Sequence, residues 1–204
     1  VTFDRSRALS REDVSFITWD HPMATGAIDK VLSTNLGTAS CGLIRKSGKP
    51  GLLLELIFVL ETSGKQRTAI DRFLPHTPLR VVVDHLGDEV TENYSVAMLN
   101  KNIVPSNIDS LLENDVFVET MLPNMISSAT EIAEEIAEQE IEKGLERMKR
   151  SLNHEINRLT ALQKKNRDIR ADEIQAAVEE RNALFALIKK ARIRLDAVQL
   201  IRME

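Results

Sequence analysis

The segment GLLLELIFVL, residues 51–60, is the longest apolar run in this chain of 204 residues. Glu55 is its only charged residue, and the run is far too short to cross a bilayer, which takes about 20 residues. Because apolar side chains occupy odd and even positions alike, both faces of a strand formed here would need to be buried. We therefore predict a central strand over residues 52–62, in a sheet covered on both sides.

Other strand-like segments lie on both sides of this run in the sequence. They are short, contain aliphatic and β-branched residues, and are mostly separated by turns with Gly or Pro. They are ASCGLIRK (39–46), QRTAIDRFL (66–74), LRVVVD (79–84) and LDAVQLIRM (195–203). The last segment follows a long helical region, and we predict that it returns to the sheet of the first half.

The second half of the chain has the periodicity of helices. Between residues 124 and 165 there is no proline and a single glycine, Gly144. Apolar residues recur there every three or four positions, which places them on one helix face. This first seam comprises Ile141, Leu145, Met148, Leu152, Ile156, Leu159 and Leu162. A second seam after a break at 166–172 comprises Ile174, Val178, Leu184, Ile188, Ala191 and Leu195.

Two long helices joined by a short break predict an antiparallel hairpin. Folding the chain back at about residue 168 brings the two seams into register. The expected partners are Leu162 with Ile174, Leu152 with Leu184, Met148 with Ile188, and Glu155 with Arg181. Upstream of the hairpin, we expect Ser106 to cap a helix and Pro123 to divide that helix from the next.

The predicted fold is therefore α+β: an antiparallel or mixed sheet with short helices, a long antiparallel helical hairpin, and a final strand that rejoins the sheet. We divide the chain into a sheet-containing module, residues 1–104, and a helical module, residues 105–195. The strand at 196–203 would complete the first module.

The stretch ALSREDVSFITWDHPM, residues 8–23, contains the only tryptophan of the chain. Ser10 is expected to cap a short helix that runs to about Thr18. Pro22 suits the first position of a second helix that runs to about Ser33, with Asp20 or His21 as its cap. We interpret Trp19 and Pro22 as structural anchors, with the Trp19 ring against the sheet, rather than as parts of a reactive site.

The sequence contains no recognisable catalytic, cofactor-binding or metal-binding motif. Thr62-Ser63-Gly64-Lys65 lacks the upstream glycine and the following hydroxyl residue of a phosphate loop. The four histidines, residues 21, 76, 85 and 154, are far apart, and Cys41 is the only cysteine, so a zinc site is not expected. We expect Cys41 to be buried in a strand, and Asp84-His85-Leu86-Gly87 to form a hairpin turn.

Glu55 is unusual because it lies within the apolar run. We expect it to lie at a sheet edge or to pair with an arginine such as Arg72. A buried functional carboxylate is the weaker alternative.

Charge is unevenly distributed along the helical half. The formal net charge of the chain is −4, which does not suit a protein that coats nucleic acid. Residues 131–142 contain six acids and no base, whereas residues 143–170 contain nine bases and three acids. The basic tip, which we define as Lys164, Lys165, Arg167 and Arg170, is a candidate contact for nucleic acid or a partner. A solvated face is the simpler interpretation. No aromatic residue interleaves the bases of the hairpin, which disfavours single-strand binding.

Four strings resemble, in this order, the C-terminal region of the RapA (HepA) family, the bacterial RNA polymerase-associated ATPases of the SWI/SNF helicase-like class. They are VTFDR, ALSREDVSFITWDHPM, RFLPHTPLRVVVD and RLDAVQLI. The resemblance runs from residue 1 to about 202, although between about 85 and 165 only the helical character matches. The chain begins at Val1 rather than a methionine, which suits a segment of a longer polypeptide.

The resemblance implies that the parent protein binds RNA polymerase and recycles it in transcription by ATP-driven translocation on nucleic acid. It also implies that the ATPase motifs lie upstream of this region, and it carries no catalytic residue into it. The expected function is a non-catalytic, cytoplasmic accessory region that contacts RNA polymerase and the upstream ATPase domains. The alternative is an arm that contacts nucleic acid through the basic hairpin surface. No cofactor and no membrane are expected.

Overall fold

A computed structural model describes residues 1–33, 38–45, 50–62, 70–165 and 171–204 of the chain. The chain forms two compact units, Val1–Ala39 and Ser40–Glu204. The division into modules at residue 104 stays a prediction.

In the first unit, the predicted helix from Ser10 to Thr18 is wrong. Helix α1 spans Arg5–Leu9 instead, and Ser10 is its C-terminal cap. The Asp4 carboxylate accepts hydrogen bonds from the amides of Ser6 and Arg7, which starts the helix earlier than expected. The guanidinium of Arg11 then binds the Asp13 carboxylate through two nitrogens, at 2.9 and 2.6 Å. Residues two apart do not face each other in a helix, so this pair fits a turn.

Helix α2 spans Pro22–Ser33, as predicted. The backbone amide of Met23 donates to Nδ1 of His21 at 3.1 Å, so His21 is the residue that caps it. Trp19 stacks on Phe3, with ring centroids 4.9 Å apart, and is 73% exposed. The expected burial of Trp19 is not found, because the amphipathic helix that was to precede it is absent. The roles of Trp19 and Pro22 as anchors stay predictions.

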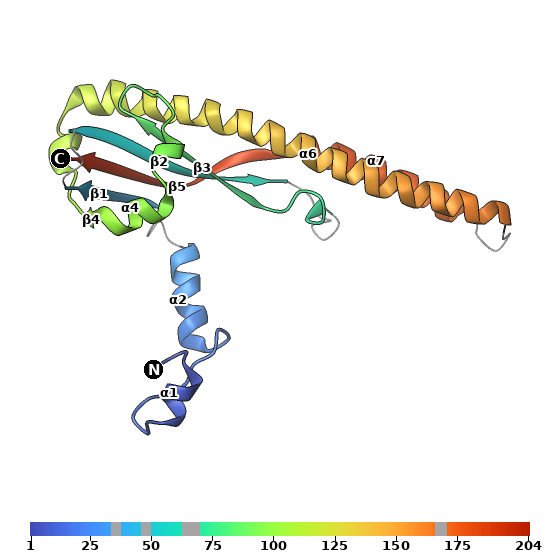
Figure 1. The fold of residues 1–204 in the computed structure, drawn as a ribbon, viewed down its shortest axis with the longest axis horizontal. Coiled ribbons are helices and arrows are strands. Elements are labelled where there is room, and N and C mark those ends of the chain that lie inside the picture. Colours follow the sequence, from blue (N-terminus) through green and yellow to red (C-terminus); the bar gives the residue numbers. More distant parts are fainter. Residues whose placement is uncertain (34–37, 46–49, 63–69, 166–170) are drawn as a thin grey trace. The chain divides into compact units, whose positions relative to one another are not determined.

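The second unit is built on a five-stranded sheet in the order β3-β2-β5-β1-β4 (Figure 1). The strands are β1 Ala39–Ile44, β2 Gly51–Glu61, β3 Thr77–Asp84, β4 Ile103–Pro105 and β5 Arg192–Met203. β2 pairs antiparallel with β3 and β5, and β1 pairs antiparallel with β4. β5 and β1 run in the same direction, so the sheet is mixed (Figure 1). The α+β class and the return of the final strand are confirmed.

The strand predicted over residues 66–74 is wrong where the structure describes it. Residues 63–69 lie outside the described ranges, and Ile70 opens a helical turn. The amides of Phe73 and Leu74 both donate to the Ile70 carbonyl at 2.8 Å. Ile70, Phe73 and Leu74 are all buried, which is a spacing of three and four residues rather than the alternation of a strand.

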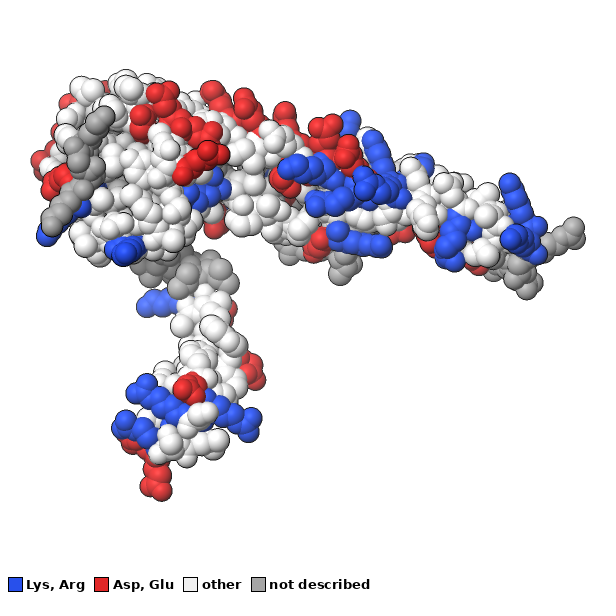
Figure 2. Space-filling model, viewed as in Figure 1, with Lys and Arg blue, Asp and Glu red and all other residues white. Residues whose placement is uncertain are grey.

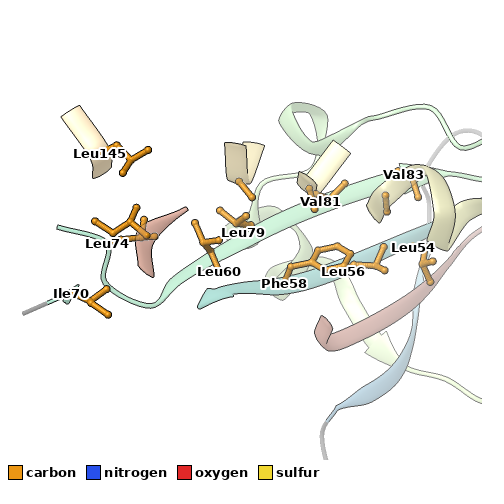
Figure 3. Close-up of a cluster of buried hydrophobic side chains, with 14 of the residues drawn as sticks. Leu54, Leu56, Phe58, Leu60, Ile70, Leu74, Leu79, Val81, Val83 and Leu145 are labelled. Carbon is orange, nitrogen blue, oxygen red and sulfur yellow. The ribbon is translucent and has the colours of Figure 1, made fainter. Parts of the chain in front are cut away.

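The main core lies between one face of the sheet and helix α6, Leu122–Lys165 (Figure 3). Leu54, Leu56, Phe58 and Leu60 of β2 point into it, as do Leu79, Val81 and Val83 of β3. Ala129, Ala133 and Ala137 form a buried stripe on α6, and their small side chains let the helix lie close to the sheet. Gly144 lets α6 lie equally close to the turn that contains Phe73, since a Cβ there would lie 3.2 Å from the Phe73 carbonyl oxygen.

A smaller core covers the opposite face of the sheet. Leu53 of β2, Val82 of β3 and Ile201 of β5 pack there with Leu99 of α4, Val96–Asn102. Leu53 and Leu54 are each 1% exposed, although their side chains point to opposite faces. The prediction of a central strand covered on both sides is therefore confirmed.

The connection into α6 differs from the prediction. A short 3₁₀ helix, η1 Thr91–Asn93, precedes α4, and helix α5 spans Asp109–Leu112. Asn107, not Ser106, accepts a hydrogen bond from the Asp109 amide at 2.8 Å. Pro123 does not divide two helices, because a π-helical turn, η2 Phe117–Met121, runs directly into α6. A π turn changes the hydrogen-bond ladder next to Pro123, which has no backbone N–H to donate.

Candidate functional site

Helices α6 and α7, Ala171–Ile188, pack as the predicted antiparallel hairpin. Met148 and Leu152 of α6 are buried, as are Leu184 and Ile188 of α7. Arg181 does not face Glu155: its Nη1 donates to Oδ1 of Asn153 at 2.9 Å. The Glu155 carboxylate instead accepts two hydrogen bonds from Arg158, one turn along the same helix. This pair lowers the pKa of Glu155 and raises the pKa of Arg158.

Burial along α6 ends part-way along the helix. Residues 122–152, the proximal segment, include every α6 side chain that is fully buried. In the distal segment, residues 153–165, the seam positions Ile156 and Leu159 are half-buried and Leu162 is 37% exposed. Figure 1 shows that this segment and α7 project beyond the strands of the sheet. With 44 residues at about 1.5 Å each, α6 is about 66 Å long.

The charges of the hairpin are segregated, as the sequence indicates (Figure 2). Acidic side chains line the proximal segment as far as Glu142, and basic side chains gather from Lys143 onwards. Most of these acids are exposed and lie opposite the alanine stripe: Glu131, Glu134, Glu135, Glu138 and Glu142.

A hollow of about 290 Å³ opens between the two helices where the proximal segment meets the distal one. We call it the mid-hairpin hollow, and its lining residues are Met148, Lys149, Asn153, Arg181, Asn182 and Phe185. The ammonium groups of Lys149 and Lys189 each lie 5.1 Å from the centroid of the Phe185 ring. An aromatic ring therefore does lie among the bases. This corrects the interpretation, made from the sequence, that no aromatic residue interleaves them.

The charge pattern along the sequence does not indicate Phe185, because the basic neighbours of this residue come from both helices. Lys149 belongs to α6, whereas Phe185 lies on α7. The signal that was available is local: Arg181, Phe185 and Lys189 follow one another at intervals of four and share one helix face.

Two asparagines hold the Arg181 guanidinium. Nη1 donates to Oδ1 of Asn153 at 2.9 Å, while Nε and Nη2 approach Oδ1 of Asn182 at 3.4 and 3.2 Å. Both acceptors are neutral amides, so the positive charge of Arg181 is oriented without being neutralised.

The basic tip is described only in part. Lys164 and Lys165 are exposed at the last turn of α6, whereas Arg167 and Arg170 lie outside the described residues. The gathering of these four cations stays a prediction.

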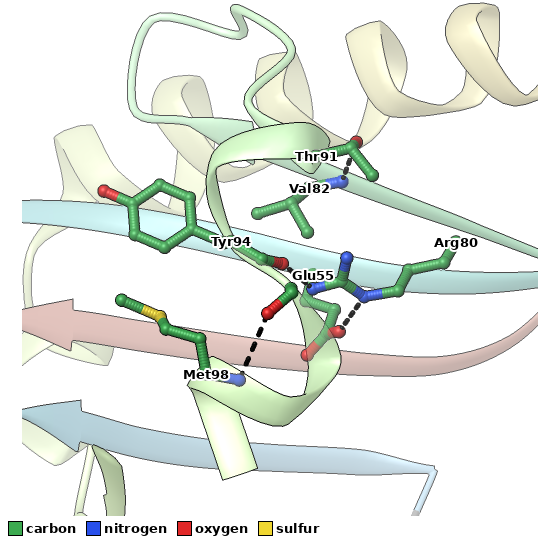
Figure 4. A network of polar contacts seen from close by, with 7 residues as sticks. Glu55, Arg80, Val82, Thr91, Tyr94 and Met98 are labelled. Atoms are coloured by element: carbon green, nitrogen blue, oxygen red, sulfur yellow. Dashed lines mark hydrogen bonds and ion pairs between the residues drawn. The ribbon is translucent and has the colours of Figure 1, made fainter. Parts of the chain in front are cut away.

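Glu55 belongs to an ion pair within the sheet (Figure 4). Nε of Arg80 lies 2.5 Å from Oε1 of Glu55, and Nη2 of Arg80 donates to the Tyr94 carbonyl at 2.6 Å. The expectation of an arginine partner holds, but the partner is Arg80 and the strand is central. Arg72 donates instead to Oγ of Ser151 at 3.2 Å. Ile57 is directly opposite Arg80 in the β2–β3 register, which brings Glu55 diagonally beside it on the same face.

Cys41 lies in β1 as predicted, but its side chain is half-buried rather than buried. Burial raises the pKa of the Cys41 thiol, which disfavours the nucleophilic thiolate. The Asp84 carboxylate accepts hydrogen bonds from the amides of Leu86 and Asp88, and Gly87 has φ +90°, so residues 84–88 form the predicted turn.

Within the residues that the structure describes, no group of three or more His, Cys, Asp or Glu side chains is placed to hold a metal ion. Nor, over the same part of the chain, is any helix both long and apolar enough to span a membrane.

Comparison with known proteins gives a family match over nearly the whole chain. Residues 1–203 match the family model described as RNA polymerase recycling family C-terminal. The chain is 35% identical over 203 residues to the RNA polymerase-associated protein RapA of Vibrio vulnificus. It is 36% identical over 205 residues to the protein of that name from Photobacterium profundum. Each alignment covers 98% of this chain but only 21% of the relative, so the chain spans about a fifth of their length.

Proposed function

We propose that this chain, which belongs to the RNA polymerase recycling family and matches the family's C-terminal region, is a non-catalytic accessory region for protein contacts in transcription. Its partners would be RNA polymerase and the upstream ATPase domains of a RapA-like parent, in the cytoplasm. The name of the relatives, RNA polymerase-associated protein, supports the first of these partners.

The observation that carries this proposal is the hairpin. Its proximal segment is fixed by a buried helix–sheet contact, whereas its distal segment and α7 pack on each other and expose their outer faces. A helical arm held firmly at one end presents a large surface while losing little conformational freedom on binding. This arrangement suits an element that reaches a partner.

The first unit supports contacts with other domains. Leu9 is 81% exposed, Trp19 73% and Met23 60%, and the unit has little core of its own. Several large apolar side chains exposed on a small unit are typical of an interaction surface. We assign these side chains to contacts with the upstream domains.

The test is a pull-down of core RNA polymerase with the tagged 204-residue chain, with and without nuclease treatment. Retention of polymerase after nuclease supports protein contact. Loss of polymerase only after nuclease indicates a bridge through nucleic acid, and no retention in either case contradicts the proposal. The purified chain should also release no phosphate from ATP, and nucleotide-dependent release that persists through further purification would contradict a non-catalytic role.

A second candidate function is a nucleic-acid-contacting arm. The observation that favours it is the run of exposed cations along the hairpin, from Lys149 and Arg150 to Lys164 and Lys165. Binding through such cations weakens steeply with salt because condensed counterions are released from the nucleic acid. Replacing the four residues of the basic tip with glutamine should weaken binding without changing stability. Salt-insensitive binding, or none at low salt, would exclude this candidate.

A further inference from the structure

The mid-hairpin hollow presents hydrogen-bond donors. The two asparagines that hold Arg181 use their oxygen atoms for that purpose. Their NH2 groups, which can only donate, therefore remain beside the guanidinium. Within the described residues, no carboxylate is hydrogen-bonded to Arg181, and none lines the hollow. A site that offers donors and positive charge is complementary to an oxyanion.

Phe185 positions two more cations at this site. The ammonium groups of Lys149 and Lys189 are both 5.1 Å from its ring centroid. The attraction between an ammonium group and an aromatic ring is worth about 0.5–1 kcal/mol at exposed sites, enough to bias two otherwise flexible lysines towards one place. Because Lys149 comes from α6 and Lys189 follows α7, the ring holds one cation from each side of the hairpin.

The distribution of cations favours an extended polyanion over a single acidic side chain. Beyond the hollow, α6 ends with the exposed cations Lys164 and Lys165. At about 1.5 Å per residue, Lys164 lies roughly 22 Å from Lys149 along the helix. A nucleic-acid strand carries phosphates at regular intervals and can contact cations at both places. A flexible single strand can also adapt its backbone to place one phosphate in a concave hollow of about 290 Å³.

We propose that the mid-hairpin hollow binds a backbone phosphate of single-stranded nucleic acid. Arg181, Asn153 and Asn182 would donate to the phosphate oxygens, and Lys149 and Lys189 would supply further positive charge. Phe185 acts as a positioning residue that keeps both lysines at the rim. The proposal rests on the second candidate function and names the site through which it operates.

The test is fluorescence anisotropy of a labelled 20-nucleotide single-stranded DNA with the 204-residue chain, across a salt series. The test variant is Arg181→Gln, and the matched control is Arg158→Gln. Both remove one positive charge from the hairpin, but Arg158 is paired with Glu155 outside the hollow. We expect Arg181→Gln to raise Kd at least fivefold and Arg158→Gln less than twofold. The slope of log K against log salt should become shallower by about 0.7 for Arg181→Gln, as the loss of one phosphate contact to a single strand requires.

Phe185→Leu provides a second variant. It keeps an apolar side chain against the hairpin but removes the ring, so Kd should rise two- to threefold while the helical circular dichroism spectrum stays unchanged. An unchanged Kd in this variant would overturn the positioning role of Phe185.

The other outcomes separate this site from the second candidate function. Equal losses for Arg181→Gln and Arg158→Gln would overturn the hollow as a site and leave a diffusely basic arm. No binding by the unmodified chain at low salt would overturn both proposals. Tighter binding of a duplex of the same sequence would overturn the single-strand assignment. Equal competition by polyglutamate would show that the hollow takes an acidic protein segment instead.

Discussion

The proximal and distal segments of α6 belong to one uninterrupted helix, yet they differ in what they contact. The proximal segment buries Met125, the alanine stripe and Met148 in the main core. In the distal segment no described side chain is fully buried, and its half-buried seam faces α7. The comparison shows that one helix can serve two purposes along its length: the first part fixes the arm, and the second part presents surface.

The two segments should therefore differ in stability. Most helical stability in proteins comes from tertiary packing, which the proximal segment has in full. The distal segment depends on the α7 contact and on local pairs such as Glu155–Arg158. Regions with few buried apolar contacts open more readily than the core.

The largest expected effect comes from matched leucine truncations in the two segments. Leu145→Ala removes a buried side chain of the main core, and it should lower the free energy of unfolding by about 2–5 kcal/mol. Leu159→Ala removes a half-buried side chain at a site that water can reach, and about 1 kcal/mol is expected. Urea denaturation measures both values. Equal losses would remove the distinction between the segments.

The next largest effect is expected from removing one of two carboxylates that each pair with an arginine. Glu55→Gln breaks a pair whose side chains are only 13% and 18% exposed, so the Arg80 charge is left poorly compensated and about 2–3 kcal/mol should be lost. Glu155→Gln breaks an exposed pair within the distal segment, and its effect should be too small to resolve in a thermal melt. A large effect at Glu155 with none at Glu55 would contradict this ranking.

Trp19→Ala should have a smaller effect on stability than Glu55→Gln. The ring is 73% exposed and loses its stacking contact with Phe3, so about 1 kcal/mol is expected. Differential scanning calorimetry tests this. An unchanged Tm together with weaker partner binding would make Trp19 a surface anchor. A loss as large as that of Leu145→Ala would show that the ring is buried in solution.

The smallest expected effect is a loss of helix stability in the distal segment at low pH. Arg158 holds the pKa of Glu155 below its usual value, so this pair stabilises the helix at neutral pH. That contribution is lost as the pH falls through the lowered pKa, where the folded protein takes up the proton. In Arg158→Gln the titration of Glu155 should move up towards its usual pKa. Chemical shifts of distal amides followed between pH 6 and pH 2 would show it, and an identical titration in Arg158→Gln would contradict it.

Much of this fold follows from local sequence patterns. A continuous apolar run predicted the central strand, a period of three to four residues predicted the hairpin, and aliphatic and β-branched residues predicted the returning strand. The wrong predictions concern contacts between residues that are far apart in the sequence, which local patterns do not predict. Ile70, Phe73 and Leu74 are apolar in either a strand or a turn, and only their packing against Leu145 and its neighbours favours the turn. The choice of Arg80 over Arg72 depends on strand register.

The candidate site was less predictable than the fold. The seams brought Arg181 to within two residues of its observed partner, Asn153. The hollow itself was missed, because its phenylalanine, lysines and asparagines come from two helices and gather only when the hairpin closes. A count of charges along one helix could not predict that arrangement.

The central claim is that the distal segment, rather than the acidic face of the proximal segment, meets the partner. Site-specific photocrosslinking tests it directly, with a benzophenone amino acid placed at exposed Asn157 in one variant and at exposed Glu138 in the other. Each variant of the 204-residue chain is mixed with core RNA polymerase, treated with nuclease and irradiated. We predict a crosslink to a polymerase subunit from position 157 and none from position 138. A crosslink from position 138 with none from position 157 would contradict the claim.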